Sequence, residues 1–209
     1  MFMPVLIAAL TAYLLGNLNG AVCVSALVAH DDVRSHGSGN AGLTNFIRNY
    51  GTASAALVIA IDAGKAAVAC WACGMMLQPY DYGFEGLTLG GLCVMLGHVF
   101  PALLGFKGGK GILSGCIVAF IVDWRIGLII LAVFALLYFL TKFVSLASIV
   151  AALTFGVCFV VFHHDNLLVM LGGIFMCALT VFMHRSNILR LVKGTESKTD
   201  LFKKKGTAQ

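Results

Sequence analysis

The stretch HGSGNAGLTNFIRN, residues 36–49, places small hydrogen-bonding residues between two hydrophobic segments. Its glycines, Gly37, Gly39 and Gly42, permit the positive φ values that let successive backbone N–H groups curve around an anion. The motif also carries side-chain donors, namely Ser38, Asn40, Thr44 and Asn45. Arg48 adds a planar guanidinium that suits phosphate, and the N-terminus of a following helix would add a favourable dipole. These residues favour a phosphate site, with an ordinary turn between two helices as the alternative.

A second polar motif, GHVFPALLGFKGGKG, covers residues 97–111. Pro101 should interrupt a helix, and the loop after it carries Lys107 and Lys110 among glycines that include Gly108 and Gly109. The G-x-x-x-x-G-K-[ST] spacing of an ATP-binding loop is absent, so the sequence implies no ATP site. Two lysines this close repel each other and favour a polyanion between them. Each lysine alone is better explained as a membrane anchor, and His98 as a hydrogen-bonded residue near a helix end.

The third motif, HRSNILRLVKGTESK, covers residues 184–198. His184, Asn187 and Arg190 are spaced by three, so in a helix they share one broad face. Gly194 is a suitable C-terminal cap. The alternative is a helix end whose basic residues extend towards lipid headgroups.

The composition indicates an integral membrane protein. The chain has 209 residues, is 60% hydrophobic and 11% charged, and has a mean hydropathy of +0.95, whereas soluble domains carry about 25% charged residues. Residues 1–29 lack a basic leader and exceed the about 7–15 apolar residues of a signal sequence, so we expect a retained span. We expect one membrane domain over residues 1–198 and a basic, disordered tail over 199–209.

Hydropathy predicts an all-α bundle of seven membrane spans. Crossing a hydrocarbon core of about 30 Å takes about 20 helical residues, so the fourth predicted span is short. With the N-terminus outside, the inner segments hold twelve Lys and Arg residues and the outer segments hold one, as expected for cytoplasmic loops. All three polar motifs then lie on the cytoplasmic face. The predicted spans are 3–29, 52–78, 84–104, 111–122, 126–141, 145–162 and 166–184.

Two charged residues lie inside the second predicted span. Asp62 and Lys65 are three residues apart, which is close enough to pair on a helix. Charges at membrane depth usually face the protein interior. We therefore expect a structural ion pair that orients the loops.

The seven cysteines all lie within apolar segments. Cys70 and Cys73 form a C-x-x-C pair, which could indicate redox or metal chemistry. No second pair and no nearby histidine completes such a site. We interpret them as small apolar residues of a buried helix.

Taken together, the three motifs resemble those of the bacterial acyl-phosphate:glycerol-3-phosphate acyltransferases, the PlsY family. The matching stretches are residues 32–48, 97–111 and 184–198, and the resemblance extends from the first span to Lys198. The chain departs from the family pattern beside these motifs. It has GNLNG where the family has a Gly-Ser-Ile-Pro type sequence, Leu43 in place of alanine, and Ile112, Leu113 and Ser114 in place of Val-Ala-Thr.

The resemblance implies a seven-helix enzyme of the bacterial inner membrane with its active site open to the cytoplasm. It would transfer a fatty acyl group from acyl-phosphate to the 1-hydroxyl of glycerol 3-phosphate, giving lysophosphatidic acid and phosphate, the first step of phospholipid synthesis. Neither a cofactor nor a metal nor nucleic acid is implied. The enzyme that supplies acyl-phosphate is a partner to consider, beside the bilayer itself.

The resemblance also suggests a role for each polar residue. The groups expected to bind acyl-phosphate are Gly37, Ser38, Gly39, Asn40, Thr44, Asn45 and Arg48. The groups expected to bind glycerol 3-phosphate are His98, Lys107, Gly108, Gly109, Lys110, His184 and Asn187. The expected catalytic residues are Ser38, Asn45, Arg48, His184 and Asn187. Acyl-phosphate is already activated, so positioning and charge stabilisation could supply much of the catalysis. The hydroxyl proton would go to His184 or to a phosphate oxygen of the donor, and we favour the phosphate.

The sequence is less consistent with three other functions. An acyltransferase with an H-x-x-x-x-D pair is disfavoured, because none of the six histidines has an aspartate five residues later. A transporter of organic phosphates would suit polar loops beside a charged span, but transporters commonly have inverted repeats and a midplane site. A scaffolding protein would not need three dense polar motifs on one face.

Overall fold

The computed structural model describes residues 1–199, which form helices and connecting loops without a strand. Of the predicted tail 199–209, all but Thr199 lies outside the described residues. The α-helices are α1 (Phe2–Gly16), α2 (Gly20–Ala29), α3 (Leu43–Tyr50), α4 (Ala55–Leu77), α5 (Gly83–Val99), α6 (Ile112–Val122), α7 (Trp124–Thr141), α8 (Val144–Phe162), α9 (Leu167–Met183) and α10 (Arg185–Val192). Short 3₁₀ turns are η1 (Val33–Ser35), η2 (Gln78–Tyr80) and η3 (Ala102–Leu104).

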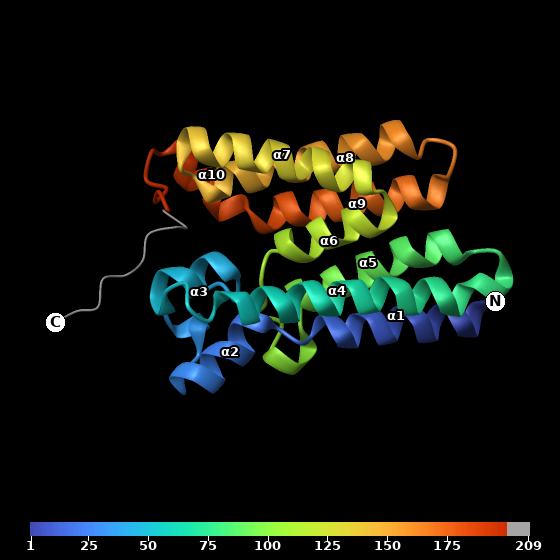
Figure 1. Cartoon of the computed structure of the whole chain (residues 1–209), viewed down its shortest axis with the longest axis horizontal. Helices are drawn as coiled ribbons and strands as arrows, with labels where there is room; N and C mark the ends of the chain where they lie inside the picture. Colours follow the sequence, from blue (N-terminus) through green and yellow to red (C-terminus); the bar gives the residue numbers. More distant parts are fainter. Residues whose placement is uncertain (200–209) are drawn as a thin grey trace.

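The long helices run side by side in two layers (Figure 1). One layer contains α1, α4 and α5, the other contains α7, α8 and α9, and the short helix α6 lies between them. The helices α2, α3 and α10 gather at one end of the bundle, and the N-terminus lies at the other. This arrangement brings the three polar motifs of the sequence to a common end.

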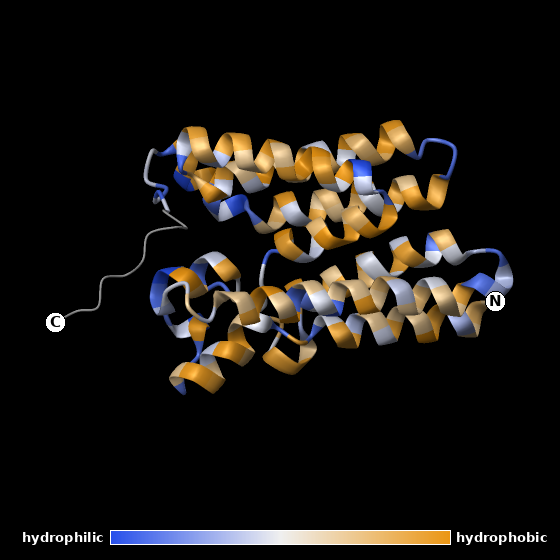
Figure 2. Ribbon diagram, in the orientation of Figure 1, coloured by the Kyte–Doolittle hydropathy of each residue, from blue (hydrophilic) through white to orange (hydrophobic). Residues whose placement is uncertain are grey.

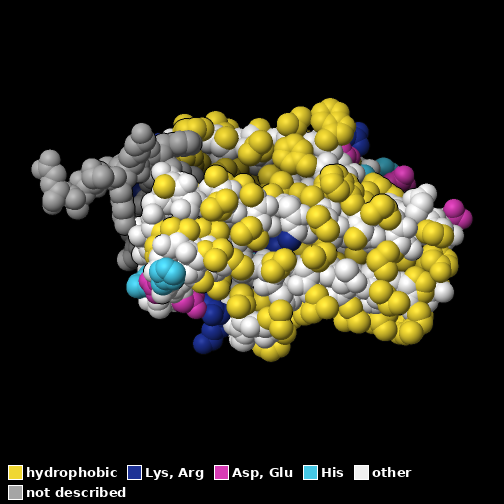
Figure 3. Space-filling view, turned by 60° about the horizontal axis from the view of Figure 1, so that its bottom comes forward, with side chains coloured by type: hydrophobic (Ala, Val, Ile, Leu, Met, Phe, Trp, Pro, Cys, Tyr) yellow, Lys and Arg dark blue, Asp and Glu magenta, His cyan; other side chains and the backbone are white. Residues whose placement is uncertain are grey.

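The outer surface of the bundle is apolar along most of its length. Hydrophobic residues line the helices while polar segments gather at the two ends (Figure 2), and most charged side chains in the space-filling view lie near the ends (Figure 3). Large hydrophobic side chains such as Leu27, Leu140 and Val157 are mostly exposed, as expected where lipid surrounds the protein.

The lengths of the helices support a multi-pass membrane protein. Within residues 1–199, five helical segments are long and apolar enough to cross a membrane, and the bent pair of α9 and α10 would make six. Helix α6 matches the short fourth span predicted from the sequence, but its 11 residues make it only a shorter apolar helix. Seven crossings therefore stay a prediction.

The first predicted span, 3–29, is not one continuous helix, because α1 ends at Gly16 and α2 begins at Gly20. Asn19 caps α2 by accepting a hydrogen bond from the backbone N–H of Val22 at 3.0 Å. Asn17 accepts one from the N–H of Leu103 at 3.0 Å. Asparagine side chains offer the backbone such alternatives to helical bonding, and here they interrupt the span.

Small residues let α1, α4 and α5 approach closely. A Cβ added to Gly16 would lie 2.7 Å from the Cα of Gly97, and one added to Gly90 would lie 2.8 Å from the Cα of Cys70. Close contact through small residues is a common way for helices to associate in membranes. Cys70 and Cys73 are buried free thiols in this packing, as their apolar sequence surroundings predicted.

Candidate active site

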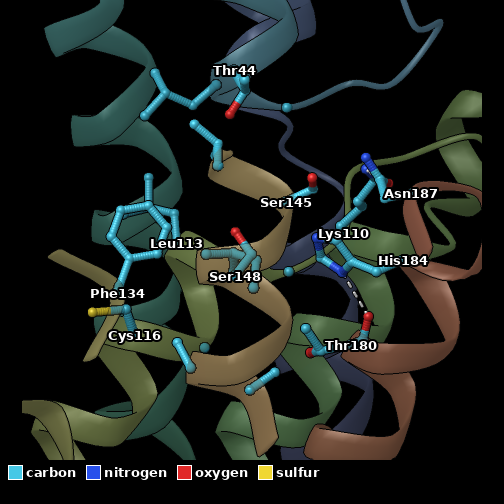
Figure 4. A pocket seen from close by; sticks show the side chains of 18 of the residues that line it. Thr44, Lys110, Leu113, Cys116, Phe134, Ser145, Ser148, Thr180, His184 and Asn187 are labelled. Carbon is cyan, nitrogen blue, oxygen red and sulfur yellow. Dashed lines mark hydrogen bonds between the residues drawn. The ribbon is translucent and has the colours of Figure 1, made fainter. Parts of the chain in front are cut away.

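One cavity of about 350 Å³ lies between the two layers and reaches the polar end of the bundle. Its polar part, called here the polar chamber, is lined by Arg48, Lys110, His184, Asn187, Arg190 and Glu196. Its deeper part, called the apolar channel, is lined by residues that include Ile130, Phe134, Ala151, Phe155 and Met176. Figure 4 shows Lys110, His184 and Asn187 together on one side of the cavity, with Leu113, Cys116 and Phe134 opposite.

Asn45 holds the first motif in shape. Its Oδ1 accepts a hydrogen bond from the N–H of Ser38 at 3.0 Å, and its Nδ2 donates to the carbonyl oxygens of Val33 and His36 at 3.0 and 3.1 Å. Gly37 and Gly39 adopt φ values of 57° and 69°, which only glycine adopts readily. These bonds of a buried amide fix the loop, and Asn45 also lines the cavity.

The N-terminus of α3 faces the cavity. Its N-cap is Gly42, and no side chain caps the first backbone N–H groups of the helix. Gly42, Leu43 and Thr44 line the cavity together with Ser38 and Asn40. An uncapped helix N-terminus with hydroxyl groups beside it is a favourable place for a phosphate.

The N-terminus of α6 offers a second such place. Gly111 is its N-cap, with a φ of 82° and no side-chain capping bond. Gly111, Ile112 and Leu113 line the same cavity. Lys110 precedes this helix start, so a cation and a set of free N–H groups adjoin each other.

Arg48 joins α3 to the segment after α10. Its Nε donates to Thr199 Oγ1 at 2.9 Å and its Nη2 donates to the carbonyl oxygen of Ser197 at 3.3 Å. Burial lowers the pKa of the Arg48 guanidinium, which stays charged because its ordinary pKa is far above neutrality.

Lys110 begins a polar network that crosses the chamber. Its ammonium donates to Asn187 Oδ1, and Asn187 Nδ2 donates to Glu196 Oε1 at 2.8 Å. Arg190 Nε donates to the other carboxylate oxygen of Glu196 at 2.7 Å. Burial, together with the positive charge of Arg190, lowers the pKa of Lys110 to about 8. Burial acts to raise the pKa of Glu196, but hydrogen bonding by the side chains around it, Arg190 included, outweighs burial and holds the pKa below its ordinary value.

His184 lies where α9 bends into α10 by 54°. Its Nδ1 is 2.8 Å from the carbonyl oxygen of Thr180. A carbonyl oxygen can only accept, so Nδ1 carries the hydrogen and Nε2 of the neutral ring is an acceptor. The ring therefore offers the chamber a lone pair with a fixed tautomer.

The structure brings most of the predicted site residues to this cavity. Those that line it are Ser38, Asn40, Thr44, Asn45, Arg48, His98, Lys110, His184 and Asn187. Gly37, Gly108 and Gly109 are not among the lining residues, and Lys107 and Gly39 lie in a separate surface hollow with Asp32 and Arg34. Asp62 and Lys65 pair at 2.7 Å as the spacing predicted.

Sequence reasoning did not assign Arg190 and Glu196 to the site. Arg190 follows His184 and Asn187 at the same spacing of three, which was the available signal. Glu196 lies beyond the C-terminal cap, and nothing local indicates that the chain turns back there. Within residues 1–199, no group of three or more His, Cys, Asp or Glu side chains is arranged to hold a metal ion.

Comparison with known proteins agrees with this geometry. A family model described as glycerol-3-phosphate acyltransferase matches residues 6–194. The chain belongs to this family. The glycerol-3-phosphate acyltransferase of Thermoanaerobacter sp. (strain X514) is 38% identical over 196 residues, covering 94% of this chain and 96% of that protein. The one from Finegoldia magna is 34% identical over 197 residues, covering 94% and 97%.

Two solved structures of PlsY, described as an integral membrane glycerol 3-phosphate acyltransferase, have the same fold. The glycerol 3-phosphate form aligns with a TM-score of 0.82 at 31% identity, covering 95% of this chain and 99% of that one. The lysophosphatidic acid form aligns with a TM-score of 0.79 at 30% identity, covering 94% and 96%. The family expected from the three motifs is confirmed, and with it a multi-pass membrane acyltransferase.

Proposed function

We propose that this glycerol-3-phosphate acyltransferase uses a fatty acyl-phosphate as donor and acylates the sn-1 hydroxyl of glycerol 3-phosphate. The observation that carries the proposal is the two-part cavity, in which groups suited to phosphate adjoin an apolar channel. A donor with a phosphate head and a hydrocarbon chain matches both parts. Related structures are described as glycerol 3-phosphate and lysophosphatidic acid forms, which are the acceptor and the product of this reaction.

The donor phosphate is assigned to the N-terminus of α3. There the free N–H groups, the Ser38 and Thr44 hydroxyls and the Arg48 guanidinium line the cavity. The acyl chain is assigned to the apolar channel between α6, α7, α8 and α9. A hydrocarbon chain that arrives from the bilayer gains little hydrophobic free energy in an apolar channel, so the channel would orient the donor and select its length.

The acceptor phosphate is assigned to Lys110, Arg190 and the N-terminus of α6. Asn187 holds the Lys110 ammonium from one side, so the lysine is fixed before the substrate arrives. Lys107 is left out of this assignment because it lies in the separate hollow on the surface. The two phosphates would then occupy neighbouring parts of one chamber.

The chemical step needs no group beyond these. The 1-hydroxyl oxygen attacks the acyl carbonyl carbon, the bond from that carbon to the phosphate oxygen breaks, and inorganic phosphate leaves. The hydroxyl proton passes to an oxygen of the departing phosphate, which becomes more basic as the bond breaks. Nε2 of His184 accepts a hydrogen bond from the neighbouring 2-hydroxyl of glycerol 3-phosphate, which orients the acceptor while the 1-hydroxyl proton passes to the phosphate. Cations and helix N-termini around the chamber stabilise the charge that moves onto the phosphate.

We further propose that residues 1–198 form one membrane domain with seven crossings and an external N-terminus. Counting α6 as the fourth crossing requires a locally thin bilayer, because its 11 residues span about 16 Å. The chamber would then face the cytoplasm of the inner membrane, where water-soluble glycerol 3-phosphate can enter.

Purified protein with palmitoyl-phosphate and glycerol 3-phosphate tests the proposed donor. We expect lysophosphatidic acid and inorganic phosphate in equal amounts, and no product with palmitoyl-CoA. Equal or better activity with the thioester would contradict the donor assignment. In proteoliposomes, flux of glycerol 3-phosphate without lysophosphatidic acid would instead favour the rival function of transport.

A further inference from the structure

Three charged or polar side chains form a buried cluster beneath the chamber. Lys65 Nζ lies 2.7 Å from Asp62 Oδ1 and 2.8 Å from His98 Nδ1. Asp62 and Lys65 belong to α4 and His98 to α5, and their exposed fractions are 2%, 5% and 5%. An ion pair buried to this degree gains little stability over an apolar replacement, so its presence calls for another explanation.

The cluster binds the break between α1 and α2. The Lys65 ammonium donates to the carbonyl oxygens of Gly16 and Leu18, the former at 3.3 Å. Asp62 Oδ1 accepts a hydrogen bond from the N–H of Gly20 at 3.1 Å. These are backbone groups that lose their helical partners where the chain is interrupted. The cluster therefore fixes the position of the break.

The break in turn holds the first motif against the loop 106–111, called here the lysine–glycine loop. Asn19, within the break, donates through Nδ2 to the carbonyl oxygen of Ala41 at 2.9 Å. The N–H of Ala41 donates to the carbonyl oxygen of Gly108 at 3.4 Å. The two motifs proposed to hold the two phosphates are thus joined at their backbones.

His98 supports the same loop directly. Lys65 can only donate, so His98 Nδ1 accepts and its Nε2 carries the hydrogen. That nitrogen faces Gly109, because a Cβ added there would lie 2.1 Å from it. The N–H of Gly109 donates to the backbone oxygen of His98 at 3.1 Å. Lys110 is the next residue, so the cluster lies directly behind the proposed acceptor site.

We propose that Asp62, Lys65 and His98 are positioning residues that hold the lysine–glycine loop, and with it Lys110, in place for glycerol 3-phosphate. His98 also lines the cavity, but one ring nitrogen is engaged by Lys65 and the other faces Gly109. We therefore assign it a role through the loop, in place of the direct contact with glycerol 3-phosphate expected from the sequence. The inference rests on the proposed assignment of the acceptor phosphate to Lys110. A positioning role predicts a selective effect on the acceptor, whereas a purely structural role predicts a loss of folded protein or a general loss of activity.

The test is Lys65→Met in the full-length purified protein, with KM measured separately for each substrate. We expect KM for glycerol 3-phosphate to rise about tenfold, equivalent to about 1.4 kcal/mol, while KM for acyl-phosphate and kcat stay near their wild-type values. The double variant Asp62→Asn/Lys65→Met leaves no unpaired buried charge, so it should fold more readily. It should show the same selective change.

Asp123→Asn is the matched control. Asp123 is also a buried carboxylate, and it pairs with Arg125 at 2.6 Å. It directly precedes α7 and is not among the residues that line the cavity. This variant should lower the thermal unfolding midpoint without changing the ratio of the two KM values.

Several results would overturn the inference. They are unchanged kinetics in Lys65→Met, a parallel change in both KM values, a fall in kcat alone, or failure of both the single and double variants to fold. Failure of the underlying assignment is seen separately, because Lys110→Ala would then leave KM for glycerol 3-phosphate unchanged.

Discussion

Lys110 makes the binding of glycerol 3-phosphate sensitive to pH near neutrality. Burial and the positive charges of Arg190 and Arg48 lower its pKa, against the opposing effect of Glu196, to about 8. A lysine in water titrates about two units higher. The ammonium form, which attracts the acceptor phosphate, is therefore present below about pH 8 and lost as the pH rises through that value.

The size of the effect follows from the charged fraction. With a pKa of about 8, that fraction falls from about nine-tenths at pH 7 to about one-tenth at pH 9, and apparent affinity scales with the competent fraction. KM for glycerol 3-phosphate should therefore rise about tenfold over this interval. The second pKa of a phosphate monoester is about 6, so the charge of the substrate does not change over the same range.

The assay measures initial rates at saturating acyl-phosphate while glycerol 3-phosphate is varied, which gives KM for glycerol 3-phosphate at each pH from 7 to 9. Lys110→Arg should flatten the pH dependence, because guanidinium stays charged throughout. Lys107→Arg should retain it, because Lys107 lies in the other hollow. A flat profile in the wild type, or a slope that persists in Lys110→Arg, would refute the assignment of the acceptor phosphate to Lys110.

Three other substitutions test the remaining parts of the site. His184→Ala should lower kcat about tenfold, the value of one positioning hydrogen bond; a loss of about 10²–10⁴ would instead make His184 the general base. Asn45→Ala removes the hydrogen bonds that fix the first motif. It should lower the free energy of unfolding by about 1–3 kcal/mol and raise KM for acyl-phosphate. An unchanged thermal unfolding midpoint together with unchanged kinetics would disprove this role. Phe155→Ala should enlarge the channel and shift kcat/KM towards longer acyl chains in a saturated series. Val157→Ala on the lipid-facing side of the same helix should not, and an equal shift in both would contradict the channel.

Hydropathy and motif chemistry predicted much of this protein because both signals are local. The predicted span 145–162 differs by one residue from α8, and 52–78 contains α4. Such spans follow from the length of chain that lipid can cover. Several polar residues of the first motif, Ser38, Asn40 and Thr44 among them, line the cavity, and their types were a local signal of the same kind.

The features that the sequence did not reveal depend on the path of the backbone between motifs. Phe106 and Gly111 both adopt positive φ values, and the loop between them turns Lys110 into the chamber while Lys107 faces the other hollow. Glu196 reaches the chamber because Arg48 and Lys142 hold the segment that follows α10. Neither turn direction nor a contact across 149 positions, as between Arg48 and Ser197, is encoded in local composition.

Photolabelling with a non-hydrolysable acyl-phosphonate that carries a diazirine at the end of its chain tests the central assignment most directly. The reagent should attach to residues that line the apolar channel, such as Ile130, Phe155 or Met176, and excess unlabelled phosphonate should prevent the reaction. Labelling confined to lipid-facing residues such as Val157 or Leu140, or labelling that competitor does not reduce, would contradict the account.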